Sequence, residues 1–327
     1  MPPAAEHWAK KRERGSYFGI QVLLFLYRYG GRWLILASLV PVLGYFFVTD
    51  RVARNASRDF LRRVHHRSGS NSRFSSEPGY WQSYCHFWQF ALAALAKLDA
   101  WIGRITPDQV SQGGSVSFAD LVASRTGGVL IGSHLGNKEV CRALVRSRYP
   151  TRINVLVFTR HARAFNRALK EANNQVDLNL IQVDGITPAL TIMLKERVEQ
   201  GEFVVIVGDR ISAASPERSV WVDFLGQPAP FAIGPWVLAS VLDCPVHLLF
   251  CMKIRQGYEL TFEPFAERIR LPRKTRDADI TQLVARYAER LEHFACRYPL
   301  QWFNFYDFWQ LPAAVSQDKE APRDASH

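Results

Sequence analysis

The chain has 327 residues and a net charge of +11 at pH 7, and 48% of its residues are hydrophobic and 13% aromatic. This composition is that of a globular protein and excludes a disordered chain, and the length favours one large α/β domain with an N-terminal extension over two equal domains. The positive charge implies an anionic partner, for which nucleic acid, anionic lipid and an acidic carrier protein are the alternatives.

The N-terminal residues predict a membrane anchor. Residues 1–16 are polar and basic, and the stretch 33–48 is uncharged. That stretch is slightly shorter than the roughly 20 residues that span a bilayer, and a proline and a glycine interrupt it. It lacks a convincing cleavage pattern of a secretory signal. We therefore expect an anchor embedded in the membrane or lying at its interface, with a buried hairpin of the soluble domain as the alternative.

Residues 51–67 predict a basic amphipathic helix. Ala53, Ala56, Phe60 and Val64 recur at helical spacing, and arginines occupy the other faces. Beside an apolar anchor, such a helix is expected to lie on anionic phospholipid. Nucleic-acid binding by the same arginines is the alternative, but it leaves the apolar anchor unexplained.

A stretch rich in Ser, Gly and Pro over residues 68–79 predicts a linker. The expected organisation is thus an anchor and basic helix over 1–67, the linker, a catalytic domain over 80–312, and a disordered polar tail over 313–327. The aromatic run that follows the linker predicts a helix whose side chains either fill the core, which is favoured, or line a groove for an acyl chain. His86 in this run has no carboxylate at matching spacing, and the sequence assigns it no role.

From residue 115 onward, apolar runs of strand length alternate with helical patterns. This alternation predicts an α/β fold with a central mixed, largely parallel sheet flanked by helices. The predicted strands are 128–132, 153–158, 178–183, 203–207, 219–224, 246–251 and 258–263, and the predicted helices are 137–148, 161–173, 187–200, 233–242 and 279–297. The five cysteines show neither a CxxC pair nor metal-ligand spacing, so we expect free thiols in a reducing compartment and no metal site.

His134 is the strongest candidate for a catalytic residue. It follows the apolar run 129–131, and Glu139 stands five positions later. Among the nine histidines, His134 alone has an acidic residue at this spacing. Because ligands of open α/β sheets gather beyond the carboxyl ends of the strands, this position favours a general base whose imidazole is held by the carboxylate. A histidine bonded to a backbone carbonyl in an ordinary loop is the alternative.

Two further strand ends carry charges. Asp209 and Arg210 follow the apolar strand 203–207, and Arg160 and Arg163 follow the strand 153–158. Such arginines can hold phosphate or polarise a carbonyl, and Asp209 can orient one of them through a bidentate pair. Solvated loop charges are the alternative for each arginine.

The segment from His134 to Glu139 resembles the His-x4-Asp/Glu block of the lipid A biosynthesis acyltransferases, the lauroyl- and myristoyl-transferases of the wider lysophospholipid acyltransferase superfamily. Four of its six residues match the family's His-Phe-Gly-Asn-Trp-Glu in place. Three further stretches resemble family blocks in the same order: residues 207–210, 222–239 and 299–309. The resemblance covers most of the chain.

The resemblance implies an enzyme on the cytoplasmic face of a bacterial inner membrane that moves a fatty acyl group from acyl carrier protein to a lipid hydroxyl. It implies an acyl-carrier or coenzyme A thioester as co-substrate, no further cofactor and no nucleic-acid partner. His134 is then the general base and Glu139 holds its imidazole, while backbone N–H groups of residues 135–138 meet the developing negative charge with the help of Arg160 or Arg210. The expected substrate-binding residues are Asn137, Arg160, Asp209 and Arg210.

The sequence departs from the family at two places. Asp307 and Phe308 stand where the C-terminal block of the family usually has basic residues. Residues 171–177 replace an arginine-rich segment that the family has between its second and third strands. Fewer cations favour an acceptor less anionic than the lipid A precursor, such as an amino-acid lipid, a polyene pigment or a glycolipid. Two other classes of function stay open: a membrane-bound thioesterase or lipid hydrolase that uses the same His134 and Glu139 to activate water, and a non-catalytic basic adaptor.

Overall fold

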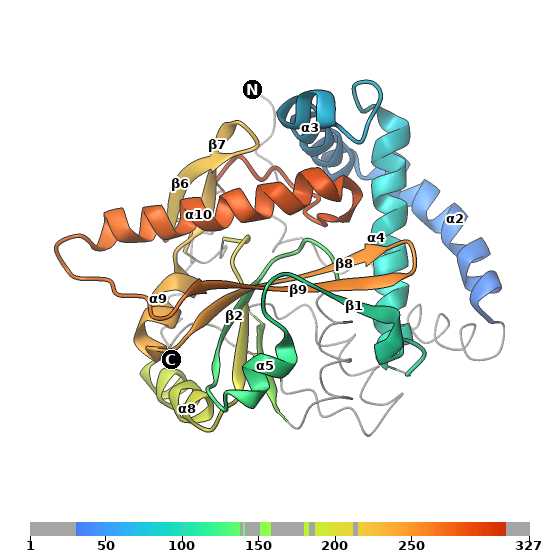
Figure 1. The fold of residues 1–327 in the computed structure, drawn as a ribbon. Helices are drawn as coiled ribbons and strands as arrows, with labels where there is room; N and C mark the ends of the chain where they lie inside the picture. The colour runs from blue at the N-terminus through green and yellow to red at the C-terminus, as the bar shows by residue number, and fades with distance from the viewer. Residues whose placement is uncertain are drawn as a thin grey trace, which may run out of the picture.

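The computed structural model describes residues 31–101, 103–137, 140, 151–157, 180–182, 187–211 and 215–311. A seven-stranded sheet with the order β1-β9-β8-β2-β5-β3-β4 forms its centre (Figure 1). Every neighbouring pair is parallel except β8 and β9. The predicted mixed, largely parallel sheet with flanking helices is therefore confirmed. Its strands are β1 (Val110–Gly113), β2 (Gly128–Gly132), β3 (Ile153–Val157), β4 (Leu180–Gln182), β5 (Phe203–Val207), β8 (Val246–Ile254) and β9 (Gly257–Ala266).

Two strands escaped the sequence analysis. β1 is four residues long and carries a single large apolar side chain, so it has no apolar run to detect. β7 (Gln227–Ala232) contains two prolines, which disfavour a central strand. It pairs only with β6 (Ser219–Phe224), in a separate two-stranded antiparallel sheet. Each strand of such a hairpin keeps one unpaired edge, where a missing N–H costs no ladder bond.

Helices cover both faces of the large sheet. Val129 and Ile131 of β2 belong to a core with α9 (Gly234–Leu242) and α10 (Arg276–Arg297). Leu130 between them belongs to a second core with α4 (Tyr80–Trp101) and α5 (Phe118–Ala123), as the alternation of side chains along a strand requires. In Figure 1, α10 crosses the molecule between the sheet and the β6–β7 hairpin. The predicted helices 187–200, 233–242 and 279–297 correspond to α8 (Pro188–Glu199), α9 and α10, whereas 161–173 and most of 137–148 lie outside the described residues.

The predicted basic helix forms as α3 (Arg51–Ser68), and its apolar face is packed within the protein. Phe60, Leu61 and Val64 are buried in the same core as α10 and β2, so protein covers this face, and contact of the helix with anionic lipid stays a prediction. Amphipathic spacing shows that a face is covered without showing what covers it. Several arginines of α3 are also engaged within the protein, since Arg62 pairs with Glu77, Arg63 with Asp59 and Arg67 with Glu292.

Before α3, the uncharged stretch forms α2 (Gly31–Thr49), which lies on the outer side of α4 (Figure 1). The side chains of Trp33, Tyr45 and Val48 are 85%, 63% and 68% exposed. Among the described residues, no single helix is long and apolar enough to cross a bilayer, and only α2 and α3 together pass that test, as a pair bent by 90°. The predicted anchor also includes residues 1–30, which lie outside the described residues.

Phe60→Ala tests whether α3 is part of the folded core. Phe60 is 1% exposed and contacts the Trp302 ring at 4.7 Å between centroids. The substitution should lower the free energy of unfolding by about 3–5 kcal/mol, because it leaves a cavity as well as removing buried apolar surface. Urea unfolding measures the effect, and Val52→Ala on the exposed side of the same helix is the control. Equal, small effects of both variants would show that α3 is a separable appendage.

Candidate active site

The strand order brings His134 and Asp209 together. β2 and β5 are parallel neighbours, and Gly132 at the end of β2 is in register with Val207 at the end of β5. The chain leaves both strands at the same edge of the sheet, so residues that follow each strand by two positions lie side by side. Two residues 75 positions apart in the sequence thereby form one site.

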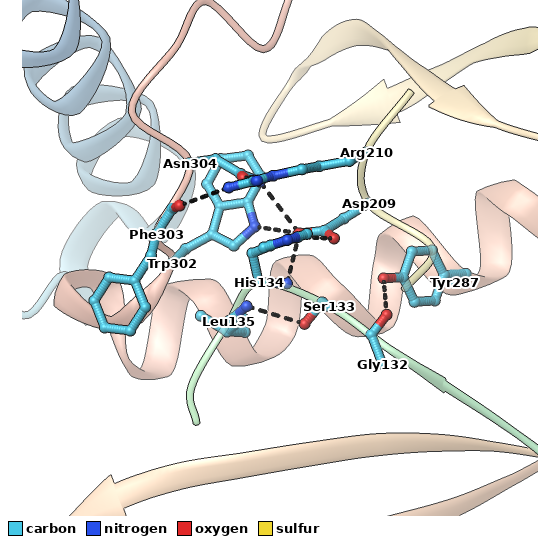
Figure 2. Close-up of polar contacts among 10 residues, drawn as sticks. All are labelled: Gly132, Ser133, His134, Leu135, Asp209, Arg210, Tyr287, Trp302, Phe303 and Asn304. Atoms are coloured by element: carbon cyan, nitrogen blue, oxygen red, sulfur yellow. Dashed lines mark hydrogen bonds and ion pairs between the residues drawn. The ribbon is translucent and has the colours of Figure 1, made fainter. Parts of the chain in front are cut away.

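Two hydrogen bonds join the pair (Figure 2). The imidazole Nδ1 of His134 lies 2.8 Å from Oδ1 of Asp209, and the backbone N–H of His134 donates to Oδ2 at 2.9 Å. An ionised carboxylate only accepts, so Nδ1 carries a proton and Nε2 is the basic nitrogen of the neutral ring. The His134 side chain is 19% exposed and that of Asp209 is fully buried, which places the imidazole between the carboxylate and the surface.

The buried Asp209 carboxylate is held by two more donors. Nε1 of Trp302 donates to Oδ2 at 2.9 Å, and Nδ2 of Asn304 donates to the same oxygen at 3.2 Å. Burial alone raises the pKa of Asp209, but the contacts with His134 and the charge of Arg210 outweigh it and hold the pKa well below its usual range. Asp209 is therefore a fixed negative charge throughout the neutral pH range.

Arg210 anchors the segment that supplies these donors. Its Nε donates to Oδ1 of Asn304 at 2.8 Å, and its Nη2 donates to the Phe303 carbonyl at 3.1 Å. The Phe303 N–H in turn donates to the His134 carbonyl at 3.0 Å, so the C-terminal segment is bound to both strand ends. The predicted substrate-binding role of Arg210 stays a prediction, since two of its contacts orient protein groups.

The loop after β2 is fixed by its own backbone. The N–H groups of Leu135, Gly136 and Asn137 donate to Ser133 Oγ, the Gln301 carbonyl and the Cys251 carbonyl respectively. They are committed to protein acceptors, so the prediction that these three groups stabilise negative charge on a substrate is wrong. Gly136 has φ of +77°, and a Cβ there would overlap the Cys251 carbonyl, which explains a glycine at this position.

The other predicted site residues fall into two groups. Glu139 and Arg160 lie outside the described residues. Asn137 is 4% exposed, and its side-chain amide donates to the Ala93 carbonyl of α4 at 2.9 Å, which favours anchoring of the loop over substrate binding. Asp209, predicted to bind substrate, instead bonds the His134 ring. Among the described residues, no three His, Cys, Asp or Glu side chains converge as a metal site requires.

Three residues with supporting contacts were not singled out from the sequence. Trp302 and Asn304 stand in an aromatic run that was taken only as a family block, and a hydrogen bond to a carboxylate leaves no spacing signal. Tyr287 is buried on α10, and its hydroxyl donates to the Gly132 carbonyl at 2.9 Å. In the sequence, Tyr287 cannot be distinguished from the other apolar positions of this amphipathic helix.

The comparison with protein families agrees with this geometry. Residues 81–310 match the family described as bacterial lipid A biosynthesis acyltransferase. This chain belongs to that family. The match begins within α4 and ends beyond Asn304, so it includes both strand ends and the segment that holds Asp209. Comparison with curated proteins gave no match. The family supports an acyltransferase that acts on a lipid, as the sequence predicted.

Asp209→Asn tests the orienting carboxylate. The amide keeps the shape but loses the charge that fixes the Nδ1–H tautomer, so acyltransferase activity should fall at least about 100-fold. The stability should respond to pH as well. Because the pKa of Asp209 is lower in the folded than in the unfolded chain, its contribution is present above the unfolded pKa of about 4 and is lost as the pH falls below it.

The difference in free energy of unfolding between wild type and Asp209→Asn should therefore be largest near neutral pH and shrink below about pH 4. Denaturant titrations across this range measure it. Asp223→Asn, at an exposed position of β6, is the matched control and should show neither effect. Full activity of Asp209→Asn would remove Asp209 from the catalytic arrangement.

Proposed function

We propose that this protein is a membrane-associated O-acyltransferase that moves a fatty acyl group from a carrier-bound thioester to a lipid hydroxyl on the cytoplasmic face of a bacterial inner membrane. The observation that carries the proposal is the buried carboxylate–imidazole pair at the carboxyl edge of the sheet, in a chain of this family. Such a pair activates a hydroxyl without a metal or a nucleophilic serine.

The proposed reaction uses the two nitrogens of His134 for different purposes. Nδ1–H stays bonded to Asp209, and Nε2 takes the proton of the acceptor hydroxyl as its oxygen attacks the thioester carbonyl. The tetrahedral intermediate then collapses, the C–S bond breaks, and the imidazolium returns the proton to the leaving thiolate. The products are the acylated lipid and the free carrier thiol, and no residue is left acylated.

We assign the orienting role to Asp209, because it already bonds Nδ1 of His134. Glu139, predicted to hold the imidazole, lies outside the described residues, so that role stays a prediction, as does substrate binding by Arg160. Arg210 lies beside the pair, and its charge already acts on Asp209. It is our candidate for a cation that stabilises the developing oxyanion, in place of the N–H groups that the loop uses for itself.

Exposed aromatic side chains support a membrane-resident acceptor. On α4, Tyr80 and Trp81 are 56% and 69% exposed, close in the sequence to the buried part of that helix, and Trp33 and Tyr45 are exposed on α2. Aromatic residues with one apolar and one polar end favour the headgroup region of a bilayer. The net charge of +11 suits both an anionic bilayer and an acidic acyl carrier protein.

A group of aromatic rings lies between the exposed side of α4 and the segment that follows Trp302. The ring of Phe90, which is 46% exposed on α4, contacts the rings of Phe303 and Phe305 at 5.5 Å between centroids. The backbone of Phe303 is bonded to His134. We propose that the hydrocarbon chain of the substrate lies along these rings, which approach the catalytic pair through Phe303.

The acceptor is proposed to be less anionic than a phosphorylated lipid A precursor. Phe308 stands where the family usually has a basic residue, and it is 3% exposed and packed against the rings of Trp302 and Phe231. It contributes to the core and supplies no charge for a phosphate. Amino-acid lipids, polyene pigments and glycolipids offer hydroxyls of the required kind.

His134→Ala tests the reaction directly. Purified protein is incubated with radiolabelled acyl carrier protein thioester and a bacterial membrane lipid extract, and the products are separated by chromatography. The wild type should label a lipid, and the variant should be slower by about 10²- to 10⁴-fold, because it lacks the general base. His293→Ala, at an exposed position on α10, is the control. Release of free fatty acid without a labelled lipid would indicate a thioesterase, and equal labelling by His134→Ala would refute the mechanism.

A double variant, Trp33→Ala with Trp81→Ala, tests the membrane-facing surface. Loss of two exposed indoles should weaken binding to vesicles of phosphatidylethanolamine and phosphatidylglycerol by about 100-fold or more, given roughly 1.5–3 kcal/mol for each large side chain that the bilayer buries. Co-sedimentation measures binding. Trp221→Ala, which removes an indole 48% exposed on the β6–β7 hairpin, should bind as the wild type does. Equal loss of vesicle binding in the double variant and in Trp221→Ala would place the membrane contact elsewhere.

A further inference from the structure

His86 is a fully buried histidine of α4 with a partner for each ring nitrogen. Nδ1 lies 3.0 Å from Oγ of Ser57 on α3, and Nε2 lies 2.9 Å from the carbonyl oxygen of Trp302. The residue has no exposed surface. It therefore connects two helices to the segment that holds the Asp209 carboxylate.

The partners of His86 fix its tautomer. A carbonyl oxygen only accepts, so Nε2 carries the proton and Nδ1 accepts from the Ser57 hydroxyl. The Ser57 oxygen in turn accepts from the hydroxyl of Ser83 at 2.9 Å. Each donor thus meets an acceptor when the ring is neutral, and burial lowers the pKa of His86 to about 3, which agrees with this arrangement.

Trp302 transmits this contact to the site. Its carbonyl accepts from His86, its indole N–H donates to Oδ2 of Asp209 at 2.9 Å, and its backbone forms a bridge with Leu135, the residue after His134. His86 thus holds the backbone of Trp302, and the side chain of the same residue bonds Asp209. A shift of the Trp302 backbone therefore moves the indole that contacts the catalytic pair.

We propose that His86 is a positioning residue that acts on the His134–Asp209 pair through the backbone of Trp302. The proposal rests on the proposed function in that His134 must be the base whose alignment is measured. It goes beyond that function because His86 touches neither substrate nor reacting atoms, and because the sequence assigned it no role.

Trp302 has no exposed surface, so its carbonyl depends on donors within the protein. This carbonyl accepts from Nε2 of His86 and from the N–H of Asn304 at 3.0 Å. Without the His86 donor it keeps only the local bond to Asn304, so the backbone of Trp302 is no longer tied to α4 and the indole N–H is held less firmly against Asp209. The carboxylate then has one weaker donor and keeps its contacts with His134 and Asn304 and the charge of Arg210, while the hydroxyls of Tyr287 and Tyr306 are further titratable groups near it. A less neutralised Asp209 holds the imidazolium form of His134 more strongly, so the acid limb of the activity profile moves to higher pH.

Two amide substitutions separate the two bonds of His86. His86→Gln places an amide N–H where Nε2 stands and keeps the bond to Trp302, whereas His86→Asn is one methylene shorter and keeps only the bond to Ser57. We expect His86→Asn to lower kcat at least about 10-fold while KM stays within about 3-fold of the wild-type value. The acid limb of its kcat/KM profile should move to higher pH. His86→Gln should recover most of the activity and the wild-type pH profile. Both are assayed below their unfolding temperatures, with labelled acyl transfer as the readout.

A second pair of variants guards against misfolding of the first. Trp302→Phe removes the indole donor to Asp209, and Trp309→Phe removes an indole whose N–H donates to the Phe224 carbonyl at 3.3 Å in the same aromatic cluster. We expect the acid limb of the pH profile to shift in Trp302→Phe and not in Trp309→Phe. Equal losses in His86→Gln and His86→Asn with an unshifted pH profile, or an unshifted profile in Trp302→Phe, would overturn it. Activity of His134→Ala would instead refute the proposed function, so the two failures are distinguishable.

Discussion

Asp209 keeps a negative charge at a position with no exposed surface, and an ionised carboxylate in that setting is stable only when donors surround it. The donors come from two segments, the loop after β2 and the run from Trp302 to Asn304. Each segment is secured in turn, the first through Gly136 and Asn137 and the second through Arg210 and His86. The long polar network around the site is thus a consequence of one buried charge.

The sequence identified both His134 and Asp209 as site residues but predicted other partners for them, Glu139 for His134 and an arginine for Asp209. His134 and Asp209 each follow an apolar strand, and that local pattern is visible in one dimension. Their contact depends on β2 and β5 being neighbours, and an alternation of strands and helices does not specify the strand order. Spacing therefore favoured Glu139, five positions away, over an aspartate 75 positions away. The same limit explains why Trp302 and His86, whose roles are hydrogen bonds between distant segments, had no signal.

Two patterns identified an element of the structure without identifying what surrounds it. The loop after His134 was expected to present free N–H groups at a helix start, yet its backbone pairs with Gln301 and Cys251 as an irregular extension of the sheet. The helix α3 was expected to lie on anionic lipid, and its apolar stripe packs on Trp302 and the core. Periodicity identifies a buried face, and backbone donors always find acceptors, but the identity of the partner is a tertiary property.

α4 links the two halves of the proposed function. Near its start, Tyr80 and Trp81 are exposed on the surface that we propose contacts the membrane, while His86, about one and a half turns later, bonds the Trp302 carbonyl. Asn137 ties the same helix to the loop that carries His134. Since a helix moves as a rigid rod over so short a distance, a shift of α4 at the bilayer displaces both segments that hold the pair. In the proposed function, membrane contact and catalytic alignment therefore depend on one element, and the lipid surface that we propose seats α4 would also determine where the imidazole points.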